Sequence, residues 1–189
     1  MKKLLIALSV AAAAMTATVA NAADYVVDTK GAHASINFKV KHLGYSWLTG
    51  RFNTFEGKFD WDKAKPAASD IEIKIDTTSI DSNHAERDKH LRSKDFLAVD
   101  KYPTATFKST SYKPTGDGKG ELSGEFNLRG VTKTITFPVS QIGEGDDPWG
   151  GYRAGFTGTT TIMLKDYNMD GYLGNLPIEL ELNVEGVRQ

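Results

Sequence analysis

Four histidines are the residues whose side chains could bind a metal ion or move a proton near neutral pH. His33 and His42 flank a stretch of alternating apolar and polar residues, whereas His84 and His90 lie six apart among helix-forming residues. At about 100° per residue, such positions are roughly 240° apart around a helix, so one metal cannot easily bind both. His84 and Asp88 can share a face, but their charged neighbours are more typical of a capped surface helix. We therefore expect no metal site.

Other catalytic patterns are weak. Asp146 and Asp147 could form a carboxylate pair, but they stand in a glycine-rich segment before Pro148, which is typical of turns. The chain has no cysteine, which excludes thiol catalysis and thiolate metal sites. No nucleophile elbow, phosphate loop or dinucleotide fingerprint is present. The sequence predicts a protein that is not an enzyme and that needs no cofactor.

The first residues have the pattern of a secretory signal peptide. Lys2 and Lys3 precede an apolar stretch that runs to about residue 17, and Ala20-Asn21-Ala22 has the small-x-small form of a cleavage site. A transmembrane anchor would need about 18 continuous apolar residues, and polar residues interrupt this run. We expect residues 1–22 to be removed on export to the periplasm, leaving 23–189 as one domain.

The charge balance of the remaining chain is nearly even. Without Lys2 and Lys3, 21 Lys and Arg stand against 24 Asp and Glu, a net charge of −3. This balance gives no reason to expect nucleic acid or an anionic membrane surface as a partner.

Beyond the signal, alternation with a period of two dominates and predicts half-buried strands. The expected strands are 24–29, 34–41, 55–62, 71–76, 104–112, 120–129, 131–141, 152–164 and 178–187. Residues 115–120 read as a hairpin loop and 143–151 as a longer loop. A short helical segment is expected near 83–97, with Asn83 as N-cap and Glu86 as its capping-box partner. Many antiparallel strands with one apolar face predict an all-β fold, a sandwich or a closed barrel.

Glycines on the apolar strand faces favour a barrel with a hollow interior. Gly57, Gly124 and Gly158 each interrupt an apolar face where a side chain would otherwise fill the interior. The alternative is that these glycines permit bends or bulges in the wall. Aromatic residues on the same faces either pack as an ordinary core or line an apolar tunnel. The candidate tunnel-lining residues are Phe38, Phe55, Gly57, Phe59, Phe107, Phe126, Phe137, Phe156, Gly158 and Ile162.

Several motifs resemble those of one known family. The segment TTSIDSNHAERDKHLRS at 77–93 is the most specific, and KYPTATF at 101–107 and HLGYSWL at 42–48 also match. Shorter matches lie at 130–133, 146–151 and 153–156. On these motifs, which span essentially the whole exported chain, the sequence resembles the YceI-like family of polyisoprenoid-binding periplasmic proteins. The loop at 171–175 is less similar to the family.

The resemblance implies an extended lipocalin-like antiparallel barrel of about eight strands. It also implies that a polyprenyl chain, such as that of a quinone or a polyprenyl phosphate, occupies a long internal tunnel, with a role in lipid carriage or stress response. The oligomeric state stays open, with a homodimer as one option by analogy with relatives, and stable membrane insertion is not expected. Two alternatives stay open at this point: an outer-membrane barrel with its apolar face toward lipid, and an enzyme acting on an isoprenoid lipid near His84 and Asp88.

Overall fold

The computed structural model describes residues 22–169, 171 and 173–189. The expected signal segment therefore lies, except for Ala22, outside the described residues. The strands are β1 (Ala23–Val27), β2 (Ser35–His42), β3 (Ser46–Phe52), β4 (Phe55–Trp61), β5 (Ile71–Asp76), β6 (Ile80–Asp81), β7 (Thr104–Gly116), β8 (Lys119–Leu128), β9 (Val131–Asp146), β10 (Tyr152–Met163) and β11 (Pro177–Arg188). The helical elements are α1 (Ala85–Arg92) and the short 3₁₀ turns η1 (Pro66–Ala68), η2 (Thr77–Ser79) and η3 (Leu164–Tyr167).

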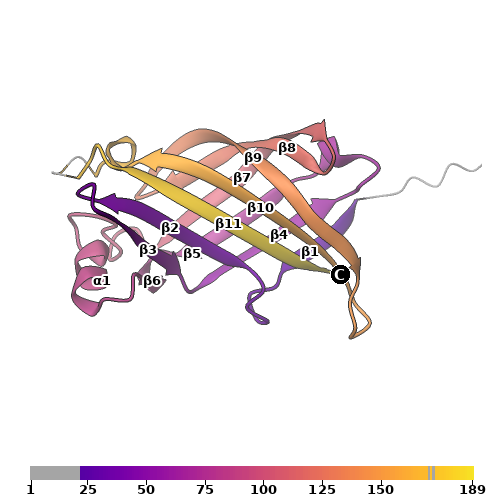
Figure 1. The fold of residues 1–189 in the computed structure, drawn as a ribbon, viewed down its shortest axis with the longest axis horizontal. Coiled ribbons are helices and arrows are strands. Elements are labelled where there is room, and N and C mark those ends of the chain that lie inside the picture. The colour runs from indigo at the N-terminus through magenta and orange to yellow at the C-terminus, as the bar shows by residue number, and fades with distance from the viewer. Residues whose placement is uncertain (1–21, 170, 172) are drawn as a thin grey trace, which may run out of the picture.

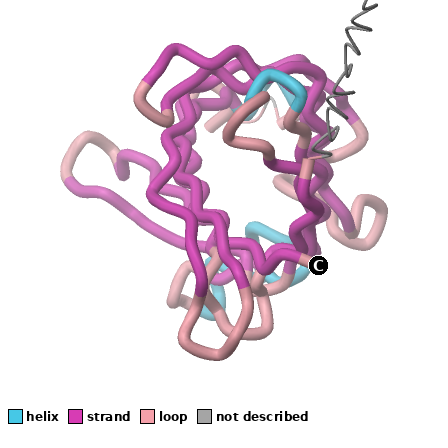
Figure 2. Tube along the Cα trace, turned by 90° about the vertical axis from the view of Figure 1, so that its right-hand side faces the viewer, coloured by secondary structure: helices cyan, strands magenta, loops and turns pink. Residues whose placement is uncertain are grey.

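Eight of these strands close into an antiparallel barrel, which confirms the predicted fold class. The order around the ring is β1-β4-β5-β7-β8-β9-β10-β11, and β1 closes it by pairing with both β4 and β11. Figure 2 shows this ring end-on. Strand β11 is long enough to pair with β1 near its end and with β2 near its start, so β2, β3 and β6 extend the wall beside the ring. Closure removes the unpaired edges that an open sheet would leave in the ring.

The two ends of the barrel differ, and we name them by what lies there. At the mouth end are helix α1, the β2–β3 turn and the segment that follows η3 (Figure 1, left). At the C-terminal end, β11 finishes beside the start of β1 and the end of β4. The alternation along each strand places apolar side chains inside the wall and charged ones outside. The interior between the two ends is therefore lined by apolar side chains.

The predicted strands are present, and the structure adds two that alternation did not reveal. Strand β3 reads as SWLTGRF, with Gly50 interrupting the face of Leu48 and Phe52, and β6 is only two residues long. The segment 143–151 was predicted as one loop, and this was wrong for its first half. Strand β9 continues to Asp146 because the backbones of Gly143 and Gly145 pair with β10, and only 147–151 form the turn.

Tight two-residue turns join several strands. Asp117 and Gly118 both have positive φ, at 52° and 71°, so the predicted hairpin at 115–120 is confirmed with a shorter loop than expected. Arg129 and Gly130 form a similar turn between β8 and β9. Positive φ at both central positions is the type I′ geometry, whose twist matches that of the flanking strands.

Helix α1 begins one residue later than predicted. Its N-cap is His84, whose Nδ1 accepts a hydrogen bond from the backbone N–H of Arg87 at 3.2 Å, while Asn83 takes a left-handed φ of 60°. The expectation of a capped surface helix was also wrong for Asp88. That side chain is buried and accepts from the backbone N–H and the hydroxyl of Ser82. Helix α1 is therefore pinned to the chain that precedes it.

An aromatic cluster crosses the barrel interior at the C-terminal end. The rings of Tyr25 and Phe59 stack at 4.8 Å, and Phe156 meets Phe59 edge-on at 5.6 Å. Trp61 then joins Phe156, at 4.8 Å, to Tyr112, at 6.3 Å. The chain of contacts links strands that are not neighbours in the ring, so the protein's own side chains narrow the interior at this end of the barrel.

Candidate ligand-binding site

A cavity of about 440 Å³ runs along the barrel interior. This volume lies within the range of natural small-molecule sites. The wall is formed by apolar side chains from most strands of the ring and from β2, together with α1 and the segment after η3. Its surface offers hydrophobic contact with few polar groups, and the charged ones lie toward the two ends.

Nine of the ten predicted tunnel residues lie in the wall of this cavity. They are Phe38, Phe55, Phe59, Phe107, Phe126, Phe137, Phe156, Gly158 and Ile162. The structure thus brings together residues from β2, β4, β7, β8, β9 and β10, although binding of a ligand by them stays a prediction.

The glycines have different roles from one another. Gly57 is not in the cavity wall, because a side chain there would collide with Ile73 and with the carbonyl of Glu72. At Gly124 the space is taken by the ring of Phe107 from the neighbouring strand. Only Gly158 borders the cavity, where an added Cβ would lie 3.1 Å from the Phe137 ring. Two of the three glycines therefore leave space for side chains of neighbouring strands and do not widen the lumen.

Several wall residues were not among the predicted set. Strand β11 contributes every second residue from Ile178 to Val184, a signal that its alternation already carried. The mouth end adds Leu91, Phe96 and Leu97 from α1 and the turn after it, and Met169, Leu173 and Leu176 from the segment after η3. No strand periodicity marks these residues, so the sequence alone could not place them in the wall.

Segment η3 folds back into the mouth end of the barrel. Tyr167 is almost fully buried, with its ring 5.6 Å from that of Phe126, and burial raises its pKa to about 12. Met169 is buried beside it. These side chains narrow the mouth end without filling it, because the cavity wall continues to Leu173 and Leu176.

Polar groups at the mouth end are mostly basic. Lys41, His42, Arg87 and His90 all border the cavity there. Arg87 is held in place by hydrogen bonds from Nε to Ser82 Oγ at 2.7 Å and from Nη2 to the Ser82 carbonyl. Because these acceptors are neutral, no carboxylate cancels the guanidinium charge in these contacts.

Charged groups at the C-terminal end are acidic. Asp60, Ser69 and Asp70 border the cavity beyond the aromatic cluster. Burial, together with the neighbouring Asp24 and Asp70, raises the pKa of Asp60 to about 6. Nearby, Trp61 Nε1 donates to Glu144 at 2.6 Å. Burial alone would raise the pKa of Glu144, but hydrogen bonds from Trp61, Gln141 and Lys63 hold it below its ordinary value.

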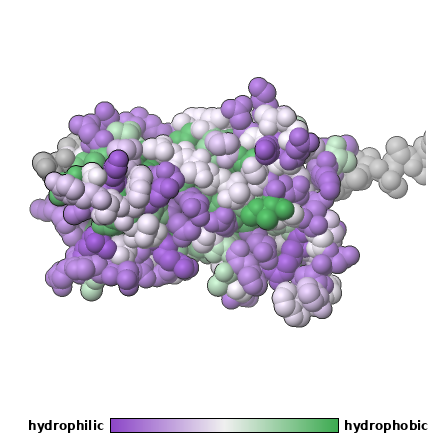
Figure 3. Space-filling view, viewed as in Figure 1, coloured by the Kyte–Doolittle hydropathy of each residue, from purple (hydrophilic) through white to green (hydrophobic). Residues whose placement is uncertain are grey.

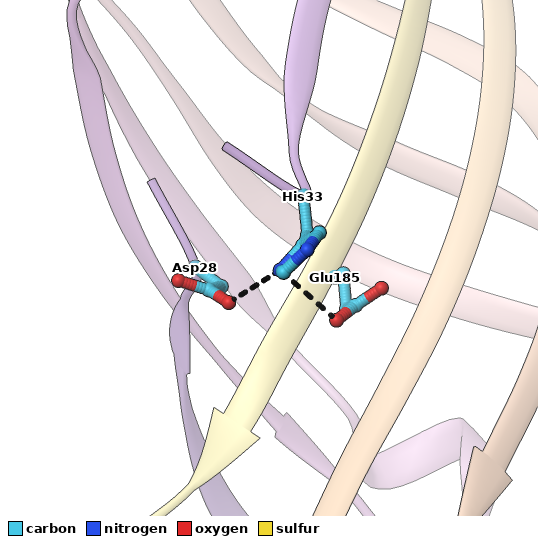
Figure 4. A group of neighbouring side chains, drawn as sticks. All are labelled: Asp28, His33 and Glu185. Carbon is cyan, nitrogen blue, oxygen red and sulfur yellow. Dashed lines mark hydrogen bonds and ion pairs between the residues drawn. The ribbon is translucent and has the colours of Figure 1, made fainter. Parts of the chain in front are cut away.

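A second titratable cluster lies on the outside of the barrel, where Asp28, His33 and Glu185 meet (Figure 4). His33 Nδ1 is 2.9 Å from Asp28 Oδ2 and 3.8 Å from Glu185 Oε1. One histidine and two carboxylates could ligate a cation. Arg153, however, already places Nη1 at 2.6 Å from Asp28 and 2.7 Å from Glu185.

Arg153 makes this cluster an ion network that ties the barrel together. Its Nε donates to Asp147 at 2.8 Å, so one guanidinium joins three carboxylates from distant parts of the chain. The Arg153 and His33 side chains hold the pKa of Asp28 well below its usual range, and the three carboxylates raise that of Arg153. Asp147 also accepts from the N–H groups of Trp149 and Gly151, so it forms the turn that its sequence context predicted.

These features define a class of protein: a lipocalin-like hollow barrel whose interior cavity has an apolar wall. The chain matches the family model described as YceI-like domain over residues 25–186, and it belongs to that family. A UPF0312 protein of Vibrio cholerae is 54% identical over 189 residues, with both chains covered completely. The resemblance read from the motif at 77–93 is thereby confirmed.

Solved structures share the fold at low sequence identity. BcnA of Burkholderia cenocepacia superposes with a TM-score of 0.75 at 22% identity, covering 84% of this chain and 98% of that one. A polyisoprenoid binding domain from Saccharophagus degradans gives 0.65 at 16% identity, covering 89% and 99%. At these identities the similarity concerns the fold.

Proposed function

We propose that this protein binds a polyisoprenoid lipid in its barrel cavity and acts as a carrier or reservoir for it. The observation that carries the proposal is the cavity of about 440 Å³ with apolar walls along the barrel axis. Each ligand CH₂ removed from water contributes about 0.8 kcal/mol, so a long prenyl chain binds without any charged contact. Ordering the chain offsets much of this gross gain. The similar domain from Saccharophagus degradans, named for polyisoprenoid binding, supports the same ligand class.

Charged pairs on the outer face of the barrel indicate that this face contacts water and not lipid. On adjacent strands β4, β5 and β7, Lys74 pairs with Glu56 at 3.2 Å, and Glu72 pairs with Lys108 at 2.6 Å. A lipid-facing barrel carries an apolar band where these charges lie. Figure 3 shows a surface that is mostly hydrophilic or neutral, with hydrophobic residues in small patches. Within the described residues, no helix has the length and apolarity to cross a membrane.

Binding without catalysis is part of the proposal. The candidate pair His84 and Asp88 has structural roles, because His84 caps α1 and Asp88 is buried against Ser82. The cluster of Asp28, His33 and Glu185 is engaged by Arg153. We further propose that the protein works in the periplasm after removal of residues 1–22, since those residues have the form of a signal peptide.

Native mass spectrometry of protein purified from a lysate that contains membranes tests the ligand. We expect a co-purifying prenyl lipid, and uptake of an added prenyl quinone or polyprenyl phosphate by protein stripped of lipid. Comparison of the two added lipids identifies the preferred head group. Protein that carries no lipid and takes up neither compound would contradict the proposal. N-terminal sequencing of the protein from a periplasmic extract tests the export step, with Ala23 as the expected first residue.

A further inference from the structure

The turn between β2 and β3 exposes three large hydrophobic side chains to water. Leu43 is 63% exposed, Tyr45 87% and Trp47 58%. Scattered single hydrophobic residues are normal on a protein surface, but three within five positions at one protruding turn form a patch. Tyr and Trp are the residues that favour the boundary between water and lipid, because each joins an apolar ring to a polar atom.

The backbone of this turn is also unfavourable for its sequence. Leu43 has a φ of 50° and Gly44 a φ of 84°, and Tyr45 N–H donates to the His42 carbonyl at 2.9 Å. This is the geometry that Asp117 and Gly118 adopt between β7 and β8, where an Asp tolerates positive φ. A leucine in the left-handed region is strained. Leu43 is thus kept where neither burial nor backbone preference favours it, which is expected of a functional residue.

The surroundings of the turn are basic in a protein that is slightly acidic overall. Lys39 and Lys41 lie on the part of β2 next to the turn, and the segment 84–95 around α1 has four Lys and Arg against three Asp and Glu. Lys39 lies 5.1 Å from the Trp47 ring and pairs with Glu179 at 2.7 Å. The excess of positive charge complements an anionic surface.

The turn adjoins the opening of the cavity. Lys41, His42 and Leu43 border the cavity, although Leu43 is largely exposed, so the interior reaches the surface beside the patch. The three exposed side chains together offer roughly 400 Å² of contact area. A stable dimer buries about 800 Å² on each partner, so this patch is too small to account for one by itself.

We propose that the β2–β3 turn docks the protein on a bilayer surface that contains anionic lipid, with the mouth of the cavity facing the membrane. Leu43, Tyr45 and Trp47 enter the interfacial layer, and the basic groups around them contact anionic head groups. Docking itself does not require a lipid in the barrel. Its use, passage of a prenyl chain between bilayer and cavity, rests on the proposed function.

Co-sedimentation with phosphatidylcholine vesicles, with and without phosphatidylglycerol, tests the docking. We expect the full chain to bind the anionic vesicles, and binding to weaken as salt is raised. The double variant Tyr45→Ser/Trp47→Ser should lower the partition coefficient at least tenfold. Trp149→Ser is the matched control, because Trp149 is 76% exposed at the opposite end of the barrel. No binding by the wild type, or an equal loss in the control, would overturn the proposal.

Leu43→Asn separates docking from folding. Asn tolerates the left-handed region, so the variant should melt at the same or a higher temperature while its vesicle binding falls. Unchanged vesicle binding would overturn the role of Leu43. If sedimentation velocity shows that the variants lose self-association and keep vesicle binding, the patch is a contact between copies and the proposal is wrong.

Tryptophan emission reports which end meets the membrane. In the Trp149→Phe variant, Trp47 is the exposed indole and Trp61 is buried, so a blue shift on adding anionic vesicles reports Trp47. The Trp47→Phe variant should show no such shift, and a shift there would overturn the orientation. Uptake of a prenyl quinone from detergent should be unchanged in Tyr45→Ser/Trp47→Ser, while transfer from vesicles slows. Failure of uptake in the wild type would contradict the carrier function and leave the docking result standing.

Discussion

The two ends of the barrel differ in how their side chains are packed. At the C-terminal end, Tyr25, Phe59 and Trp61 join a cluster of stacked and edge-on rings, and Arg153 fastens the wall outside with three carboxylates. At the mouth end, the cavity reaches an exposed turn, and neutral oxygens of Ser82 hold Arg87. One end places its large side chains against each other, and the other leaves them partly in contact with empty space or water.

This difference indicates which residues mainly determine folding stability and which mainly determine ligand binding. Side chains packed on all sides contribute most to folding free energy, whereas side chains that border a cavity lose fewer contacts when truncated. Substitutions at the C-terminal end should therefore act mainly on stability, and those along the cavity should act mainly on ligand uptake.

The largest effect is expected for Phe59→Ala. Phe59 is buried and contacts Tyr25 and Phe156, so the truncation should lower the free energy of unfolding by about 4 kcal/mol. Phe38→Ala is the matched control nearer the mouth, and it should lower that free energy by about 2 kcal/mol because its ring is only partly buried. Urea denaturation measures both values. Equal losses would remove the distinction between the two ends.

Asp28→Asn should weaken the ion network that Arg153 forms on the outside of the C-terminal end. The pKa of Asp28 is lowered in the folded state, so its charge stabilises the fold above the ordinary Asp value of about 3.9. We expect the variant to lose about 2 kcal/mol at pH 7. The advantage of the wild type should shrink as the pH falls below about 4. A difference that stays constant down to pH 2 would assign the loss to packing and not to the charge.

Gly158→Leu tests the cavity between the two ends. An added Cβ lies 3.1 Å from the Phe137 ring, so a larger side chain must shift that ring or enter the lumen. Overpacking should lower stability by about 1–2 kcal/mol, while prenyl uptake, measured by titration with a prenyl quinone, falls at least tenfold. Gly143→Leu is the matched comparison, since a Cβ there meets nothing within 4 Å and Gly143 is not in the cavity wall. Normal uptake by Gly158→Leu would show that Gly158 only shapes the wall.

The smallest effect is expected for Asp60→Asn, and its sign is opposite to that of Asp28. The pKa of Asp60 is raised to about 6, so the folded state holds its proton more tightly than the unfolded chain. Wild-type stability therefore falls as the pH rises from about 4 to about 6. The variant should gain about 1 kcal/mol at pH 8 and nothing near pH 4, after discounting for partial exposure. An equal gain at both pH values would point to packing instead.

Much of the wall of the cavity could be predicted from period-two alternation. Phe55 and Phe59 are four positions apart, so they share a face in any strand. In the same way, Phe126 on β8 and Phe156 on β10 each share a face with apolar residues of their own strand. Once the faces are known, a closed ring must turn them inward. The helical segment was predictable too, because 83–92 breaks the alternation, but the cap residue was not: Asn83 and His84 both offer a suitable side chain, and the backbone of the preceding turn selects His84.

By itself, the sequence determined the one-sided strands, the absence of thiol chemistry and the family, because each depends on residue type and on spacing along the chain. Only the tertiary structure decided that Gly57 and Gly124 seat neighbouring side chains and that Arg153 gathers Asp28, Asp147 and Glu185. It also decided that the exposed turn at Leu43 lies beside the opening of the cavity. Pairing register and barrel closure bring residues more than a hundred positions apart into contact, and no local pattern records that distance.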